Sequence, residues 1–159
     1  MTPEWLAVAR VIHVLAVILW IGGVGMVTTV LLPTARREAD PAGGVKLFLL
    51  IEEGFSLQAK LTVLLAGLSG FAMLGSLHGW ERLLHPGASW WVLPMVLIWL
   101  LFTVVLFILE PLVMRHRLPL LAARDPAGLL GFLARAHRVL LTLSLIAAGL
   151  AVAGAHGLL

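Results

Sequence analysis

The sequence predicts an all-α integral membrane protein: one four-transmembrane-helix bundle that covers residues 1–159 as a single domain. Hydrophobic residues make up 61% of the chain and charged residues only 12%, which is outside the range of water-soluble globular domains. Four apolar stretches reach the roughly 20 residues that a helix needs to cross a bilayer. These stretches are continuous, whereas a transmembrane β-barrel alternates apolar and polar residues. The expected helices cover residues 5–33, 41–78, 90–115 and 126–156.

The first expected helix contains a histidine well inside its apolar stretch. His13 shares a face with Ala16, Trp20 and Gly23 at helical spacing. Small residues on such a face favour close packing against a neighbouring helix. The stretch is too long for a secretory signal peptide, and two arginines follow it where a small-residue cleavage site would be needed. We therefore expect a retained membrane span.

The second expected helix is longer than a bilayer is thick. It begins at Asp40-Pro41, an N-cap residue followed by proline at the first helical position. At 1.5 Å per residue it reaches roughly 55 Å, against a hydrocarbon core of ~30 Å. We expect this helix to project from the membrane or to kink near Gly54.

The second and third expected helices each place one charge inside the apolar zone. Lys60 and Glu110 both fall about 9–13 Å from the midplane, on the same side, at 1.5 Å per residue. An unpaired charge at that depth is costly, so we expect Lys60 and Glu110 to pair. The alternative is that Lys60 extends its ammonium group to the membrane interface.

The fourth expected helix repeats the Asp-Pro start, at Asp125, and carries two histidines. His137 lies near its beginning and His156 near its end. The face that contains His156 passes through Gly149 and Val152 or Ala153, and we expect that face to pack against another helix.

Basic residues gather in two of the three expected loops, and this indicates the orientation. By the positive-inside rule these loops are cytoplasmic, which places both the N- and the C-terminus on the external, periplasmic side of a bacterial inner membrane. The sequence pI near 10.6 is then a consequence of topology, and no nucleic-acid partner is expected. The basic residues in and beside these loops are Arg36, Arg37, Lys46, Arg115, Arg117, Arg124, Arg135 and Arg138.

Four side chains suited to metal or haem binding are expected near one depth. Two of them are His13 and His156, which fall about 9–11 Å on the external side of the midplane; the others are Met73 and Met95. The chain has no cysteine, which excludes thiolate metal sites and covalent c-type haem. One interpretation is haem b with imidazole axial ligands. Another is a copper site made by all four residues.

Structural roles remain open for the same residues. An intramembrane imidazole can serve only to hydrogen-bond across helices, and Met commonly fills gaps in a core. The mid-membrane Trp20 and Trp99 either line a pocket or pack in the core.

On the cytoplasmic side, a second group of polar residues could form a polar entrance, and His137 within it could ligate a second haem. The members of this group are Glu52, Glu53, Gln58, Arg135 and His137.

The segment Ile12-His13-Val14-Leu15-Ala16-Val17-Ile18-Leu19-Trp20-Ile21-Gly22-Gly23 resembles the first helix of copper-resistance D-type (CopD-like) membrane proteins and of the related HemJ-type protoporphyrinogen oxidases. The resemblance implies a haem b ligand at His13. Lys60, in Gln58-Ala59-Lys60-Leu61, is similar to an intramembrane lysine of the HemJ-type proteins. The copper-resistance branch implies copper uptake across the inner membrane instead.

Three functions are consistent with these residues. The first is a haem b-binding membrane protein in electron transfer or oxidoreduction, of the quinol or porphyrinogen type or as an accessory respiratory subunit. The second is a copper-binding or copper-transport protein, and the third is a cofactor-free structural or assembly subunit. Expected partners are membrane lipid, a quinone or porphyrin, and either a second copy or a larger respiratory complex. Any enzymatic activity would be that of a membrane oxidoreductase.

Overall fold

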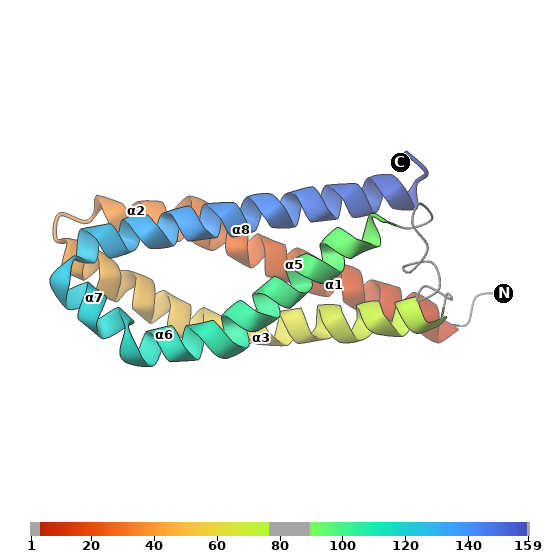
Figure 1. Ribbon diagram of the computed structural model, residues 1–159, viewed down its shortest axis with the longest axis horizontal. Helices are drawn as coiled ribbons and strands as arrows, with labels where there is room; N and C mark the ends of the chain where they lie inside the picture. The colour runs from red at the N-terminus through yellow and green to blue at the C-terminus, as the bar shows by residue number, and fades with distance from the viewer. Residues whose placement is uncertain (1–3, 77–89, 159) are drawn as a thin grey trace.

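The computed structural model describes residues 4–76 and 90–158, and every regular element in these residues is a helix (Figure 1). Four helical segments are long and apolar enough to span a membrane, which confirms the predicted number of spans. The end expected at residue 78 lies outside the described residues, and the helix expected from residue 90 begins at Val92. The four segments are Glu4–Arg37, Pro41–Ser76, Val92–Val113 and Pro126–Ala155.

Two of the four segments are composite. In the first and third, a short π-helical turn separates two α-helical parts, and a small helix then connects the third segment to the fourth. The elements are α1 (Glu4–Met26), η1 (Val27–Leu31), α2 (Leu32–Arg37), α3 (Pro41–Ser76), α5 (Val92–Val104), η2 (Val105–Leu109), α6 (Glu110–His116), α7 (Leu118–Arg124) and α8 (Pro126–Ala155).

The two Asp-Pro sequences cap helices as predicted. The carboxylate of Asp40 accepts hydrogen bonds from the backbone N–H groups of Ala42 and Gly43, at 3.1 and 3.0 Å. The carboxylate of Asp125 accepts one from Gly128 at 2.8 Å. Each side chain satisfies backbone donors that have no partner within the first helical turn. These caps fix the starts of α3 and α8.

Both π-helical turns precede a proline. η1 comes just before Pro33, and η2 just before Pro111. Proline lacks the N–H that would bond to the carbonyl four residues earlier, and its ring crowds that carbonyl. A widened turn at such a position relieves the crowding. Glu110 follows η2 directly as the first residue of α6.

The core consists of two clusters. The first lies among α2, α3, α7 and α8, and includes the fully buried Leu32, Phe48 and Leu130. The second joins α1, α3 and α5 around Ala16, Trp20, Val24, Val63, Ala66 and Phe102. The predicted inner face of α1 is thus confirmed. A Cβ on Gly23 would meet the ring of Phe55, so this glycine admits the close approach of α1 and α3.

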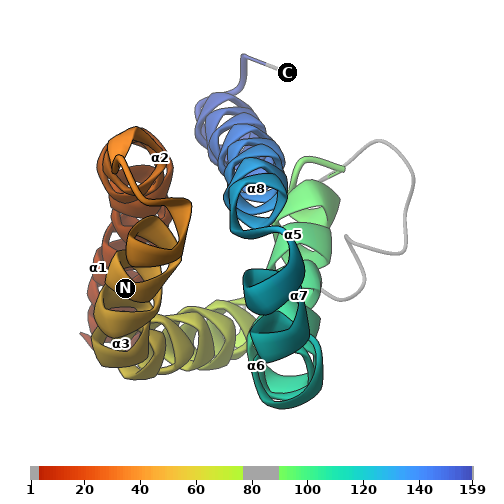
Figure 2. The same ribbon diagram turned by 90° about the vertical axis from the view of Figure 1, so that its left-hand side faces the viewer.

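The bundle has two distinct ends (Figures 1 and 2). α1 starts and α8 finishes at the same end, which we call the termini end. α2, α7 and the first turns of α3 and α8 form the opposite end, which we call the basic end because Arg36, Arg37, Lys46 and Arg124 lie there. α3 is one uninterrupted helix of 36 residues between the two ends.

The predicted packing face near the end of α8 is wrong. Val152 is 62% exposed, and Gly149 is exposed, with no atom within 4 Å of where a Cβ would lie. The face that packs is instead that of Gly154, which is buried and lies against the ring of Trp91. α8 is apolar on all sides along this stretch, so the position of small residues alone did not indicate which side faces inward.

Candidate functional site

An ion pair joins α3 to α6 inside the bundle. The Lys60 Nζ lies 2.8 Å from the Glu110 Oε1, which is the pairing expected from the sequence. Ser56 completes the group: its hydroxyl donates to the same Glu110 oxygen at 2.5 Å and accepts from Lys60 at 2.7 Å. The two charged side chains are 28% and 15% exposed. Each charge in this mostly enclosed site therefore has a partner, as the low dielectric of a membrane requires.

Helical spacing gathers the acidic and polar groups on one face of α3. Glu52, Ser56 and Lys60 follow one another at intervals of four residues, and side chains four apart lie side by side on a helix. Glu110 approaches this face from the start of α6, directly after the η2 turn. Ser56 is absent from the sequence-based predictions, although its four-residue spacing from Glu52 and Lys60 was a signal that could have found it.

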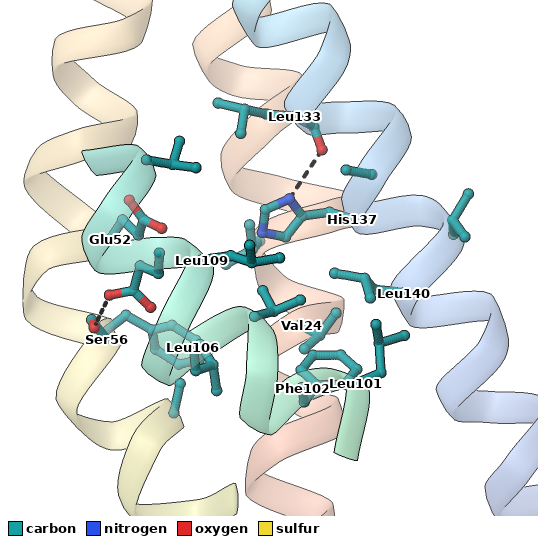
Figure 3. A pocket seen from close by; sticks show the side chains of 18 of the residues that line it. Val24, Glu52, Ser56, Leu101, Phe102, Leu106, Leu109, Leu133, His137 and Leu140 are labelled. Carbon is teal, nitrogen blue, oxygen red and sulfur yellow. Dashed lines mark hydrogen bonds between the residues drawn. The ribbon is translucent and has the colours of Figure 1, made fainter. Parts of the chain in front are cut away.

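A cavity of about 660 Å³ lies between α1, α3, α8 and the α5–η2–α6 segment. Its walls are mainly aliphatic and aromatic, and its volume is in the range typical of sites for small molecules. Both π-helical turns border it, through Val27 and through Val105 and Leu106. Figure 3 shows Glu52, Ser56 and His137 among the side chains that line it. The sequence suggested a polar entrance here, and the structure brings its Glu52, Arg135 and His137 to one cavity.

A second cavity, of about 480 Å³, adjoins the first at the basic end. Glu52, Ser56, Glu110 and Leu118 line both cavities, so these four residues form a shared wall. Glu53 lines only the second cavity and is exposed. Gln58, the remaining residue of the expected entrance, is exposed and lines neither of these two cavities.

Within residues 4–76 and 90–158, two buried side-chain polar atoms have no hydrogen-bond partner, and both belong to residues that line the larger cavity. They are the indole Nε1 of Trp20 and the Oε2 of Glu52. Trp99, the other mid-membrane tryptophan, differs because its indole N–H donates to the Val63 carbonyl at 2.9 Å. Buried polar groups without partners are rare in proteins, because each has lost its bonds to water without replacement.

His13 is held by a neighbouring helix. Its Nδ1 lies 2.9 Å from the carbonyl oxygen of Ala66 and 3.3 Å from the Ser69 hydroxyl, both on α3. A carbonyl can only accept, so in the neutral ring Nδ1 carries the proton and Nε2 keeps its lone pair. Gly70 gives the ring room, since a Cβ there would come within 3.1 Å of the His13 Cε1. Residues of α3 therefore fix both the orientation and the tautomer of this imidazole.

His137 has the same tautomer through a bond within its own helix. Its Nδ1 lies 3.0 Å from the carbonyl of Leu133, one turn earlier in α8. The ring meets Phe48 edge-on, with centroids 6.2 Å apart, and extends into the larger cavity (Figure 3). Nε2 is again the nitrogen with the free lone pair.

The remaining predicted ligands are less enclosed. His156 ends α8, is exposed, and bonds through Nδ1 to the Val152 carbonyl of its own helix at 2.8 Å. Met73 and Met95 are half-buried near the ends of α3 and α5. All four predicted copper ligands thus lie toward the termini end. In the described part of the chain, no group of three or more His, Asp or Glu side chains is placed to hold a metal ion.

Comparison with protein-family models, with curated protein sequences and with solved structures gave no match to this chain.

Proposed function

We propose that this chain is a haem b-binding membrane protein that takes part in electron transfer, with His13 as an axial ligand of the iron. The observation that carries the proposal is the state of the His13 imidazole. Its Nδ1 is bonded to the Ala66 carbonyl of α3 and its Nε2 is left with a lone pair. Imidazoles that ligate metals typically donate their other nitrogen to such an acceptor, which orients the ring and increases its basicity.

The side chains that could ligate a metal in this chain fit a haem iron better than a metal site made only of protein ligands. A b-type haem needs one or two neutral imidazoles and an apolar surrounding, and it needs no cysteine. In their neutral form, the imidazoles of His13 and His137 each have a fixed tautomer, with the lone pair on Nε2. When bound, the haem would supply one-electron chemistry. The resemblance of the His13 segment to HemJ-type proteins agrees with His13 as the ligand, and His137 is the second candidate.

Copper has less support from the geometry. A copper site would need His156 together with His13 and the two methionines, yet His156 is exposed and bonds to its own helix. A purely structural function is the stronger competitor, since the bond from His13 to Ala66 already joins α1 to α3.

We assign the protein to a bacterial inner membrane as a multi-pass protein with its basic end in the cytoplasm and both termini in the periplasm. Support comes from the separation of charge along the bundle: four of the basic residues lie at the end opposite to the termini. Basic residues beside short loops favour retention on the cytoplasmic side.

Absorption spectroscopy tests the haem proposal. The protein is expressed with adequate haem supply, purified in mild detergent, and measured as reduced-minus-oxidised spectra with metal analysis. We expect a b-type α-band in the wild type, loss of this band in His13→Ala, and its return when free imidazole is added to that variant. Only an iron ligand, and not a structural histidine, predicts recovery with free imidazole.

The matched control is His156→Ala, which removes an exposed imidazole and should keep the band. A band that is lost in His137→Ala but kept in His13→Ala would move the ligand to α8. A colourless wild-type protein would refute the haem proposal, and bound copper in its place would favour copper handling.

A further inference from the structure

We propose that the larger cavity binds a lipid-soluble aromatic diol of the quinol class, held between the Glu52 carboxylate and the Trp20 indole N–H. The role of this quinol as electron donor to a haem rests on the function proposed above. Binding of the quinol, however, depends only on groups of this chain that line the cavity.

The first step of the argument is that the cavity lacks partners for its own polar groups. Trp20 is 4% exposed, and among the described residues its N–H has no acceptor and the Glu52 Oε2 has no donor. One is a pure donor and the other an acceptor, and both residues line the same space. Leaving a buried polar atom unpaired costs about 1–3 kcal/mol. A ligand that satisfies both atoms would recover this cost.

The second step concerns the walls, which select an apolar ligand with a flat ring. Aromatic side chains contribute strongly to the lining through Trp20, Phe55 and Phe102. Trp20 and Phe102 meet edge to face with centroids 4.8 Å apart. Such rings favour contact with another aromatic ring.

The third step is to compare possible occupants. The acyl chain of a membrane lipid would fill the space but would leave both polar atoms unpaired. A fatty acid could reach Glu52 with its carboxyl group, but its alkyl chain would offer no acceptor to the Trp20 N–H and no ring to Trp20 and Phe102. A ring with two hydroxyl groups can donate one proton to the Glu52 oxygen and accept from Trp20 with the other oxygen. The free Nε2 of His137 offers a further acceptor on the α8 side.

Glu52 also places this binding mode beside the second, more polar cavity. Glu52, Ser56 and Glu110 also line the second cavity, which leads toward the exposed Glu53 at the basic end. A quinol hydroxyl bonded to Glu52 would therefore lie at the boundary between the larger, apolar cavity and the smaller, more polar one.

Equilibrium binding to the full-length protein in lipid nanodiscs tests the proposal. The probe is a decyl-substituted benzoquinol under anaerobic conditions, with its dimethyl ether and decylbenzene as matched ligands that lack the hydroxyl donors. We expect saturable binding of the quinol, and Kd values at least about tenfold weaker for the two matched ligands.

Two substitutions test the assigned contacts. Glu52→Leu should weaken quinol binding at least about tenfold, because the hydrogen bond between the quinol hydroxyl and the Glu52 carboxyl group is lost. Trp20→Phe keeps the ring and removes only the N–H, and should weaken binding about three- to tenfold. Glu53→Leu and Trp99→Phe are the matched controls, since Glu53 does not line this cavity and the Trp99 N–H already has a partner. Their Kd values should stay within about twofold of wild type.

The outcomes separate this inference from the haem proposal. Glu52→Leu removes an unpartnered buried oxygen, so its thermal midpoint should not fall, and weakened binding would then report the contact itself. Equal Kd values for the quinol and decylbenzene, or for wild type and Glu52→Leu, would show a cavity that merely holds alkyl chains, and would overturn the inference. Quinol binding that depends on Glu52 in a protein without a b-type band would refute only the haem.

Discussion

Glu110 and Glu52 line the same cavity wall, but their carboxyl groups have different partners. The carboxylate of Glu110 holds two donors, the Lys60 ammonium and the Ser56 hydroxyl, at one oxygen. Glu52 lies on the same cavity wall with one oxygen unpaired. The two carboxylates thus line one wall but differ in their partners: two protein donors hold one oxygen of Glu110, whereas the Oε2 of Glu52 has no donor among the described residues.

We predict that Lys60→Met lowers the free energy of unfolding by about 1–3 kcal/mol, because Glu110 keeps its charge in an enclosed site after its cation is removed. Denaturant titration in mixed micelles measures this loss. The double variant Lys60→Met/Glu110→Gln should recover at least half of it, since no unpaired charge remains. Lys46→Met on the same helix serves as the control, as Lys46 is exposed. A loss in Lys60→Met no larger than that in Lys46→Met would mean that the pair contributes nothing.

At the scale of elements, glycines determine how closely the helices approach. At Gly44, a Cβ would collide with the backbone oxygen of Ala35 in α2. A backbone atom cannot move aside as a side chain does. At Gly54, also in α3, nothing lies within 4 Å of the Cβ position. The same helix therefore carries one glycine that its packing requires and one that it does not.

Gly44→Ala should reduce the free energy of unfolding by about 1–3 kcal/mol, because α2 and α3 must separate to admit the methyl group. Gly54→Ala should leave stability unchanged or raise it by up to about 1 kcal/mol, the gain in helix propensity of alanine over glycine. Unfolding in mixed micelles again provides the comparison. Equal effects at the two positions would contradict the α2–α3 contact.

The four spans, the Asp40 and Asp125 caps and the inner face of α1 could be predicted because each depends on local sequence. Length, hydropathy and cap chemistry are readable without knowing any neighbour. The site could be predicted only in part. The pairing of Lys60 with Glu110 follows from the cost of an isolated charge, but the unpaired state of Trp20 and Glu52 depends on which atoms the other helices bring near.

The error on the Gly149 face of α8 has the same physical origin. A helix that is apolar on every side has no hydrophobic stripe that indicates its inward direction. Which glycine lies at an interface is then decided by the rotation of the helix, and hence by packing against partners such as Trp91. The two cavities could not be predicted for the same reason, because their walls come from separate segments of the chain.

For the whole molecule, the orientation in the membrane is the property that most constrains function, because it decides which side the two cavities approach. The smaller cavity lies near α7 at the basic end. If that end is cytoplasmic, the smaller cavity and the Glu52 wall lie toward the cytoplasm. The chain contains no cysteine, so a single introduced thiol reports its own location without background.

Two cysteine variants test this orientation. Glu38→Cys lies between α2 and α3 at the basic end, and Leu158→Cys lies beyond α8 at the termini end; both positions are exposed. In spheroplasts, a membrane-impermeant maleimide should label Leu158→Cys at once and Glu38→Cys only after permeabilisation, because the positive-inside rule places the arginine-rich loops in the cytoplasm. The unsubstituted chain should not be labelled in either condition.

The two contrary outcomes have different meanings. The reverse labelling pattern would place the smaller cavity and the Glu52 wall toward the periplasm. Labelling of both variants in intact spheroplasts would contradict the odd number of spans that separates the two positions, because an odd number of crossings must leave them on opposite sides. In that case at least one of the apolar segments after Glu38 would not cross the membrane, and the basic end could not be assigned to the cytoplasm.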